Sequence, residues 1–178
     1  MAKNNQEIEV KATFQDQQAV LNILQPQLTF VNRVSINDTY FSSGASMSNT
    51  NNLVRIREIN NDKVELTFKG KTVDTNNIWQ RTEITTLVDS ATNAKAILAN
   101  LGLKVVSEYQ NAKEYYDYNG LEIVFARFTL PATLEFMEIE GDTTTAVAEV
   151  IEKLGQTITV VGEEIFDVFD RARNNTAN

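Results

Sequence analysis

The stretch Glu7-Ile8-Glu9-Val10-Lys11 alternates charged and apolar side chains without interruption. Successive side chains of a strand point to opposite faces, so this stretch predicts a β-strand with one charged face and one apolar face. Phe136-Met137-Glu138-Ile139-Glu140 repeats the pattern far along the chain. If these two strands are neighbours, their carboxylates meet and form a site suited to a hard metal ion. The four carboxylates are Glu7, Glu9, Glu138 and Glu140.

Alternation of this kind predicts eight strands. They cover residues 6–14, 33–42, 53–59, 63–70, 78–88, 105–118, 121–129 and 133–140. The links are short and polar, and Asn60-Asn61-Asp62, Asp74-Thr75-Asn76-Asn77 and Asn119-Gly120 are typical of hairpin turns. The prediction is therefore an α+β fold that is mainly β, built on a closed eight-stranded antiparallel barrel that forms a tunnel, with flanking helices.

Helical periodicity separates and follows these strands. Helices are expected between Asp16 and Pro26, after Ser90 up to Gly102, over about residues 143–154, and from Glu163 to Arg173 with Phe166 and Phe169 on one side. Their apolar residues need an apolar surface, which only the apolar faces of the strands provide. We therefore expect the helices outside the barrel and the charged faces inside. The residues expected to contact the barrel are Val20, Leu24, Ile97, Leu98, Val147 and Ile151.

Such a lumen carries both signs of charge. The expected cations are Lys11, Arg55, Arg57, Lys69 and Arg81, and the carboxylates are Glu7, Glu9, Glu65, Glu83, Glu138 and Glu140. Ions taken out of water each lose several kcal/mol of solvation, so we expect a ligand to neutralise them. A polyphosphate with a divalent metal ion does so, because arginines bind phosphate oxygens in pairs while glutamates hold the metal. The alternative is that these are solvated faces of ordinary amphipathic strands.

The composition limits the chemistry further. The 178 residues include no Cys and no His, which excludes thiol nucleophiles and sulfur-based zinc sites and leaves oxygen as the metal donor. Mg²⁺ or Mn²⁺ is then favoured for phosphate chemistry. A net charge of -8 argues against a nucleic-acid partner. Without an apolar run of membrane length or a signal-peptide core, we expect a cytoplasmic protein without a membrane partner, forming one domain over residues 1–178 with a frayed tail at 171–178.

In their order along the chain, the charged motifs resemble the CYTH, or triphosphate tunnel metalloenzyme, superfamily. The matching elements are the E-x-E-x-K of Glu7 to Lys11, the D-T-Y-F of Asp38 to Phe41, Leu53 to Arg57, Glu65 to Gly70, the R-x-E of Arg81 and Glu83, and the F-x-E-I-E of Phe136 to Glu140. The resemblance implies a tunnel that takes a triphosphate-containing small molecule together with Mg²⁺ or Mn²⁺. Known members include inorganic triphosphatases, thiamine triphosphatases, class IV adenylyl cyclases and RNA triphosphatases of the capping type.

The resemblance also implies roles for individual residues. Glu7, Glu9, Glu138 and Glu140 are the implied metal ligands and, with Lys11, the catalytic group; Lys11, Arg55, Arg57, Lys69, Arg81 and Lys113 are the implied triphosphate contacts; Glu65 and Glu83 support the lumen. Lys113 stands near a position where the family usually has Arg. The family's usual Asp before the last E-x-E is absent near Ala126.

Three functions follow as alternatives. The first is metal-dependent hydrolysis of tripolyphosphate, thiamine triphosphate or a nucleoside triphosphate. The second is an adenylyl cyclase of class IV type, and the third is a weak or inactive polyphosphate or nucleotide sensor. A homodimer is left open. We interpret Trp79, Tyr109, Tyr115, Tyr116 and Tyr118 as barrel packing rather than a base-stacking platform, and Arg127 as outward-facing.

Overall fold

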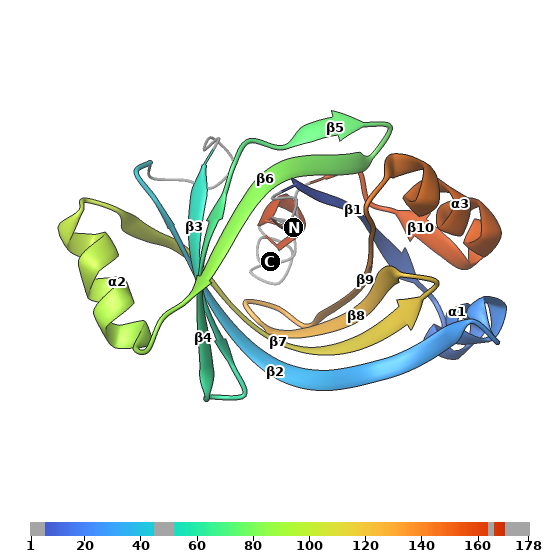
Figure 1. Ribbon diagram of the computed structural model, residues 1–178, viewed down its shortest axis with the longest axis horizontal. Coiled ribbons are helices and arrows are strands. Elements are labelled where there is room, and N and C mark those ends of the chain that lie inside the picture. The colour runs from blue at the N-terminus through green and yellow to red at the C-terminus, as the bar shows by residue number, and fades with distance from the viewer. Residues whose placement is uncertain (1–5, 45–51, 164–165, 170–178) are drawn as a thin grey trace, which may run out of the picture.

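The computed structural model describes residues 6–44, 52–163 and 166–169. Its central feature is a closed antiparallel barrel of eight strands (Figure 1). In order around the barrel these are β1 (Gln6–Phe14), β9 (Leu134–Glu140), β8 (Leu121–Leu130), β7 (Lys104–Tyr118), β2 (Leu28–Ser42), β3 (Leu53–Ile59), β4 (Lys63–Lys69) and β6 (Ile78–Leu87). Residues 6–9 of β1 pair with β6 and close the ring. The predicted fold class is confirmed.

Two short strands extend the barrel wall. β5 (Val73–Thr75) pairs with β6, and β10 (Ile158–Val160) pairs with the second half of β1. The sequence did not predict either, because three residues are too few to show an alternation. β2 begins at Leu28 rather than at residue 33, since its first residues pair with the far end of β7, where Leu28 lies opposite Tyr118.

The predicted turns between β3 and β4 and between β7 and β8 are confirmed by the backbone. Asn119 and Gly120 have φ values of 53° and 85°, the left-handed pair that a two-residue hairpin needs. Asn60 and Asn61, between β3 and β4, are also left-handed at 52° and 56°. Asparagine tolerates this conformation better than other residues with a side chain, which explains its frequency at these turns.

Helices α1 (Gln17–Leu24) and α3 (Thr144–Leu154) pack together against the outer surface of the barrel. Asp16 begins α1 by accepting a hydrogen bond of 2.8 Å from the backbone N–H of Gln18, and Thr143 caps α3 in the same way. Val20 and Val147 are fully buried against the apolar face of β1, where Val10 is also fully buried. The prediction that the helices lie outside is confirmed here (Figure 1).

Helix α2 (Ala91–Asn100) lies on the opposite side of the molecule, where Ala94 and Leu98 pack near Phe41 and Ile56. The prediction that Ile97 contacts the barrel is wrong, because its side chain is 60% exposed. Residues 94 and 98 are one helical turn apart and form a stripe one residue wide, so the neighbouring position points to solvent.

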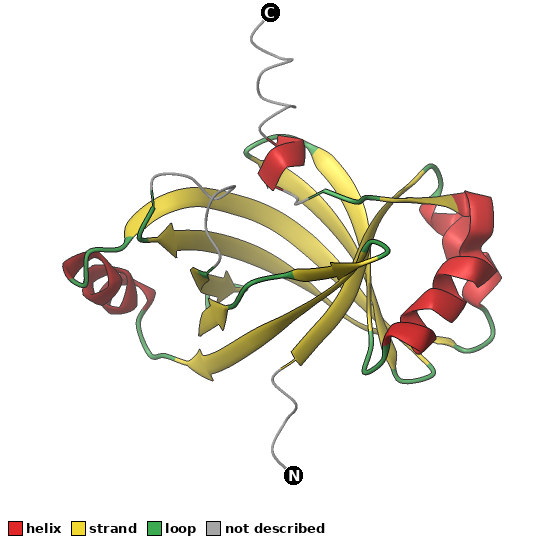
Figure 2. Ribbon diagram, turned by 90° about the horizontal axis from the view of Figure 1, so that it is seen from above, coloured by secondary structure: helices red, strands yellow, loops and turns green. Residues whose placement is uncertain are grey.

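A one-turn 3-10 helix, η1 (Gly155–Thr157), follows α3, and residues 166–169 are helical. These four residues lie at one end of the barrel (Figure 2). Of the predicted helix 163–173, residue 163 is not helical, and residues 164–165 and 170–173 lie outside the described residues. Most of the loop predicted over 42–52 and the tail at 171–178 also lie outside the described residues. Within the described residues, no helix is long and apolar enough to span a membrane.

Candidate functional site: the barrel lumen

A cavity of about 730 Å³ occupies the barrel lumen. All twelve residues predicted as site residues line it: Glu7, Glu9, Lys11, Arg55, Arg57, Glu65, Lys69, Arg81, Glu83, Lys113, Glu138 and Glu140. They come from six strands and share one parity on each strand, which places them on the inner face. Closure of the barrel therefore brings together residues that are spread from position 7 to position 140.

Arg57, on β3, is held by Asp38 on the neighbouring strand β2. Its Nε and Nη2 atoms each donate a hydrogen bond of 2.8 Å to the two carboxylate oxygens of Asp38. Burial by itself would raise the pKa of Asp38, but the guanidinium groups of Arg57 and Arg55 outweigh it and hold that pKa below its ordinary value. Asp38 is 4% exposed, so this paired arrangement fixes the Arg57 guanidinium inside the lumen.

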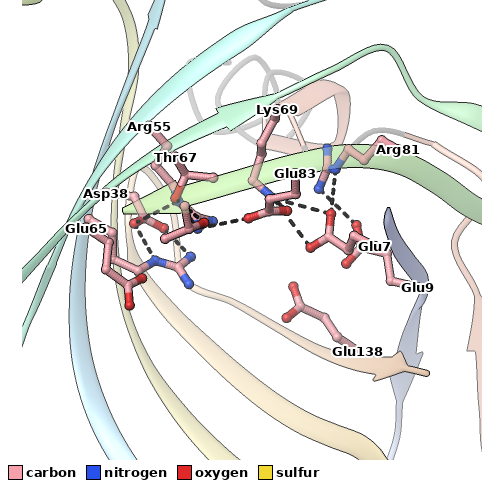
Figure 3. A network of polar contacts seen from close by, with 12 residues as sticks. Glu7, Glu9, Asp38, Arg55, Glu65, Thr67, Lys69, Arg81, Glu83 and Glu138 are labelled. Carbon is pink, nitrogen blue, oxygen red and sulfur yellow. Dashed lines mark hydrogen bonds and ion pairs between the residues drawn. The ribbon is translucent and has the colours of Figure 1, made fainter. Parts of the chain in front are cut away.

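Lys69, at the end of β4, stands between two carboxylates (Figure 3). Its Nζ atom is 2.6 Å from Glu83 Oε2 and 3.4 Å from Glu7 Oε2. Burial and the nearby Arg81 guanidinium lower the pKa of Lys69 to about 8, in spite of these two carboxylates. A second cation, Arg81, approaches Glu7 at 2.6 Å. The two cations outweigh the effect of burial and hold the pKa of Glu7 well below its ordinary value.

Two lysines form ion pairs with glutamates of the neighbouring strands β1 and β9. Lys11 contacts Glu9 at 2.5 Å and lies over the ring of Trp79, 5.0 Å from its centroid. Lys113 reaches from β7 to Glu138, also at 2.5 Å. Burial would raise the pKa of Glu138, but Lys113 and Lys11 hold it at about 2. Lys113 is thus inside the lumen, where the sequence resemblance expected a cation.

The lumen charges neutralise one another in pairs. The sequence predicted that a bound ligand would neutralise them, and the structure shows that the lumen side chains also form ion pairs with one another, both within β1 and between strands. A phosphate ligand would replace the carboxylates that now form ion pairs with Lys69, Arg57 and Arg81. Ligand binding therefore begins from an ordered set of buried cations rather than from mobile ones.

Glu140 is the exception to this pairing. Within the described part of the chain, its side chain forms no ion pair or hydrogen bond. Burial, together with repulsion from Glu7, Glu9, Glu122 and Glu138, raises the pKa of Glu140 to about 8. The register explains this crowding, because Glu140 lies directly opposite Glu9 on one side and Glu122 on the other. This end of the lumen holds more negative charge than the nearby cations compensate.

The same acidic end gives a test of whether the site suits a divalent cation. Among the residues that the structure describes, no three carboxylates converge closely enough to hold one, because Glu7, Glu9 and Glu138 point toward lysine and arginine partners. The donors nevertheless fit in kind, since all are carboxylate oxygens. They also fit in sign, because the raised pKa of Glu140 reports uncompensated negative charge.

Several lining residues were missed by the sequence reasoning. They are Asp38, Tyr40, Tyr109, Asn111, Tyr115 and Glu122. On β7 the spacing of Tyr109, Asn111, Lys113 and Tyr115 at every second position was a usable signal. Our interpretation of the tyrosines as barrel packing is incomplete, because Tyr109 and Tyr115 also face the cavity. Glu122 gave no such signal, since the residues that follow it are apolar on both faces.

Ala126 lies on the inner face of β8, directly opposite Lys113. It is 2% exposed, and its neighbours on that face, Val124 and Phe128, are also apolar. This face of β8 therefore adds no carboxylate beyond Glu122. Arg127 points outward as expected, and its side chain is 60% exposed beside Glu135.

Comparison with known proteins gives both a family and a fold. A family model described as the CYTH domain matches residues 5–171. No curated protein matches the chain significantly. Among solved structures, a conserved hypothetical protein from Pyrococcus furiosus is 23% identical, with a TM-score of 0.73 over 90% of this chain and 98% of its own.

Two further structures carry descriptions of activity. A Hippeastrum protein proposed to be an adenylyl cyclase, and described as having a dominant triphosphatase activity, is 17% identical, with a TM-score of 0.73 over 93% of this chain and 96% of its own. A Vibrio parahaemolyticus protein proposed to be an adenylate cyclase is 19% identical, with a TM-score of 0.61 over 83% of each chain. At these identities the likeness establishes the barrel fold.

Proposed function

Because this chain belongs to the CYTH domain family, we propose that it binds a triphosphate-containing small molecule in the barrel lumen and hydrolyses one of its phosphoanhydride bonds with the help of Mg²⁺ or Mn²⁺. The observation that carries this proposal is the set of six cations around one cavity: Lys11, Arg55, Arg57, Lys69, Arg81 and Lys113. Their side chains are between 4% and 12% exposed. Buried cations in such number fit a polyanion that runs along the lumen.

The shape and position of each cation decide which phosphate contacts it can make. Arg55 and Arg57 present planar guanidinium groups from adjacent inner positions of β3, which suits paired contacts to non-bridging phosphate oxygens. Lys69 and Arg81 extend the row on β4 and β6. In the proposed complex these groups orient the phosphate chain and stabilise the charge that develops on the transferred phosphoryl group.

CYTH domain proteins are generally dependent on a divalent metal ion. Glu7, Glu9, Glu138 and Glu140 would hold it here, and the bound ion would supply Lewis-acid stabilisation of phosphate oxygens. When these carboxylates leave Lys11, Lys113 and Arg81, the three cations become available to phosphate. We therefore expect the affinity for triphosphate to rise when Mg²⁺ is present.

Phosphate release decides the proposal. Tripolyphosphate, thiamine triphosphate and ATP are each incubated with the protein and Mg²⁺ or Mn²⁺, and cyclic AMP is measured in parallel to separate hydrolysis from cyclisation. Lys69→Ala should lower tripolyphosphate affinity by about 10- to 100-fold, because it removes a charged hydrogen-bond donor. Lys71→Ala is the matched control, since this exposed lysine lies just beyond the end of β4. If no substrate binds or turns over, the proposal is wrong.

A second candidate, a polyphosphate or nucleotide sensor without turnover, is favoured by the apolar inner face at Ala126. It predicts that triphosphates bind tightly and that no product forms. Ala126→Asp would place a carboxylate opposite Lys113. A gain in Mg²⁺ affinity and in phosphate release on this substitution identifies a weakened hydrolase, whereas a gain in neither favours the sensor.

A further inference from the structure

The end of the cavity opposite Glu140 is lined by aromatic rings. Tyr40, Tyr109, Phe128 and Phe166 all border the cavity, and they pack edge to face or tilted against one another with centroids 5.3–6.1 Å apart. None of these four side chains is charged. Phe166 comes from the helical residues 166–169, which reach the barrel from outside its strands. We call this group the aromatic end of the lumen.

Asn111 sits within this aromatic end and has an unusual environment. It lies directly opposite Phe128 on β8 and two residues from both Tyr109 and Lys113 on the inner face of β7. The residue is 5% exposed, yet neither the oxygen nor the nitrogen of its amide has a hydrogen-bond partner among the described residues. A buried amide without partners is destabilising, so its presence beside a cavity points to a ligand that supplies them.

A second orphaned donor lies at the border between the aromatic end and the cations. The Nε atom of Arg55 makes no hydrogen bond among the described residues, and the nearest carboxylate oxygen, on Asp38, is 3.9 Å away. Arg55 lies directly opposite Tyr40 on the neighbouring strand. Lys113 lies two residues after Asn111 on the inner face of β7. The aromatic end therefore opens directly onto two of the cations that the proposed function assigns to phosphate.

From this arrangement we infer that the aromatic end binds the planar nitrogen heterocycle of an organic triphosphate, with the Asn111 amide bonded to a ring edge that offers a donor beside an acceptor. An asparagine amide carries one acceptor and one donor group side by side, and it pairs with such an edge through two hydrogen bonds. The aromatic rings provide an apolar wall against which a planar ring can pack. A cavity of about 730 Å³ is of the size that encloses a whole organic ligand.

This inference rests on the proposed function, because the phosphate chain must occupy the neighbouring cations. It deepens that function by naming an organic triphosphate, rather than inorganic tripolyphosphate, as the ligand class. Two sources share the required chemistry: the adenine of ATP and the aminopyrimidine of thiamine triphosphate both carry an amino group beside a ring nitrogen.

Binding of ligands with and without a ring tests the inference. The dissociation constants of tripolyphosphate, thiamine triphosphate and the non-hydrolysable β,γ-imido analogue of ATP are measured with Mg²⁺ by calorimetry. Trp79, the single tryptophan, gives an independent signal because it lies beside Lys11 in the lumen. In the wild-type protein, at least one ring-bearing ligand should bind tenfold or more tightly than tripolyphosphate, and the tighter of the two identifies the source of the ring.

Asn111→Leu removes the amide at nearly constant volume. It should weaken the preferred ring-bearing ligand by about 10- to 100-fold and leave tripolyphosphate within about twofold. It should also raise the Tm of the ligand-free protein, because an unpartnered buried amide is lost. Asn32→Leu, the same substitution at an exposed position of β2, is the control and should change neither affinity.

The outcomes separate the two proposals. If none of the three ligands binds, the proposed function is wrong. If tripolyphosphate binds and neither ring adds affinity, only the heterocycle subsite is wrong. Equal weakening of all three ligands by Asn111→Leu, with a lower Tm, would make Asn111 a structural residue and would also overturn the inference. Should Asn111→Leu fail to fold, Asn111→Ser and the wild-type comparison of ligands give the same decision.

Discussion

Two ion pairs connect β9 to its surroundings, one inside the barrel and one outside, and they differ in almost every physical respect. Lys113 and Glu138 meet in the lumen with side chains 8% and 14% exposed. On the outer face, Arg127 and Glu135 form a pair with side chains 60% and 43% exposed. Each pair joins a basic residue to a glutamate of β9, and the basic residue comes from β7 on the inner face and from β8 on the outer face. The side of the barrel wall on which an ion pair lies therefore determines how much of it is exposed to water.

The comparison shows why the inner charges suggest a function and the outer ones do not. An exposed pair is surrounded by water and contributes little to stability. Inner charges have lost that water, and each depends on its partners, so a ligand that replaces a partner must restore the interaction that it breaks. Four substitutions, described from the largest expected effect to the smallest, test this difference between the two faces.

The largest effect is expected for Arg57→Met, on the inner face. The substitution leaves the carboxylate of Asp38, which is 4% exposed, without the two hydrogen bonds it accepts. The free energy of unfolding should fall by about 3–5 kcal/mol, measured by urea denaturation. The double variant Asp38→Asn/Arg57→Met should recover most of the loss, because no carboxylate is left buried without a partner. A double variant as unstable as the single one contradicts this account.

On the outer face, helix packing should give a somewhat smaller effect. Leu98→Ala removes a buried side chain from the contact between α2 and the barrel and should cost about 2–3 kcal/mol in the free energy of unfolding. Ile97→Ala, at the neighbouring position that is 60% exposed, should stay within about 0.5 kcal/mol. Similar losses in the two variants, measured by thermal denaturation, would mean that α2 is placed differently.

The acidic end of the lumen should make stability depend on pH. In the metal-free protein the pKa of Glu140 is raised from 4.5 to about 8, so the folded state keeps a proton that the unfolded chain releases. Stability should therefore fall as pH rises from about 4.5 to 8, by on the order of 2 kcal/mol after allowance for partial exposure of this group. Glu140→Gln should flatten this slope in unfolding experiments with EDTA, and a slope unchanged by the substitution would refute the assignment.

The smallest effect is expected for Arg127→Ala. Its pair with Glu135 is exposed, so the free energy of unfolding should change by less than about 1 kcal/mol, with triphosphate binding unaffected. Lys113→Ala, which breaks the matching inner pair, should be clearly more destabilising and should weaken triphosphate binding as well. Comparable effects of the two substitutions on binding would show that Lys113 does not contact the ligand.

Much of the lumen was predictable because alternation is a local property of the chain. Glu7, Glu9 and Lys11 share a face whatever strand pairs with β1, and the same holds for Arg55 and Arg57 on β3. Where alternation is weak, prediction failed. Asp38 is flanked by Asn37 and Thr39, which are also polar, and the apolar residues after Glu122 hide its inward direction. The prediction for Ile97 failed for another reason: helical periodicity does not show how many side chains of α2 contact the barrel.

The sequence by itself thus determined which side chains share a face, where hairpins turn and which metals and phosphate contacts the composition allows. Only the tertiary structure decided which charges become partners, because the pairing of Glu7 with Arg81 joins residues 74 positions apart and depends on how β6 closes onto β1. Closure likewise crowds Glu140 against Glu9 and Glu122, and it buries the Asn111 amide beside Phe128 with no hydrogen-bond partner in the part of the chain that the structure describes. Alternation is set within a strand, whereas pairing and burial arise only when distant strands meet in one register.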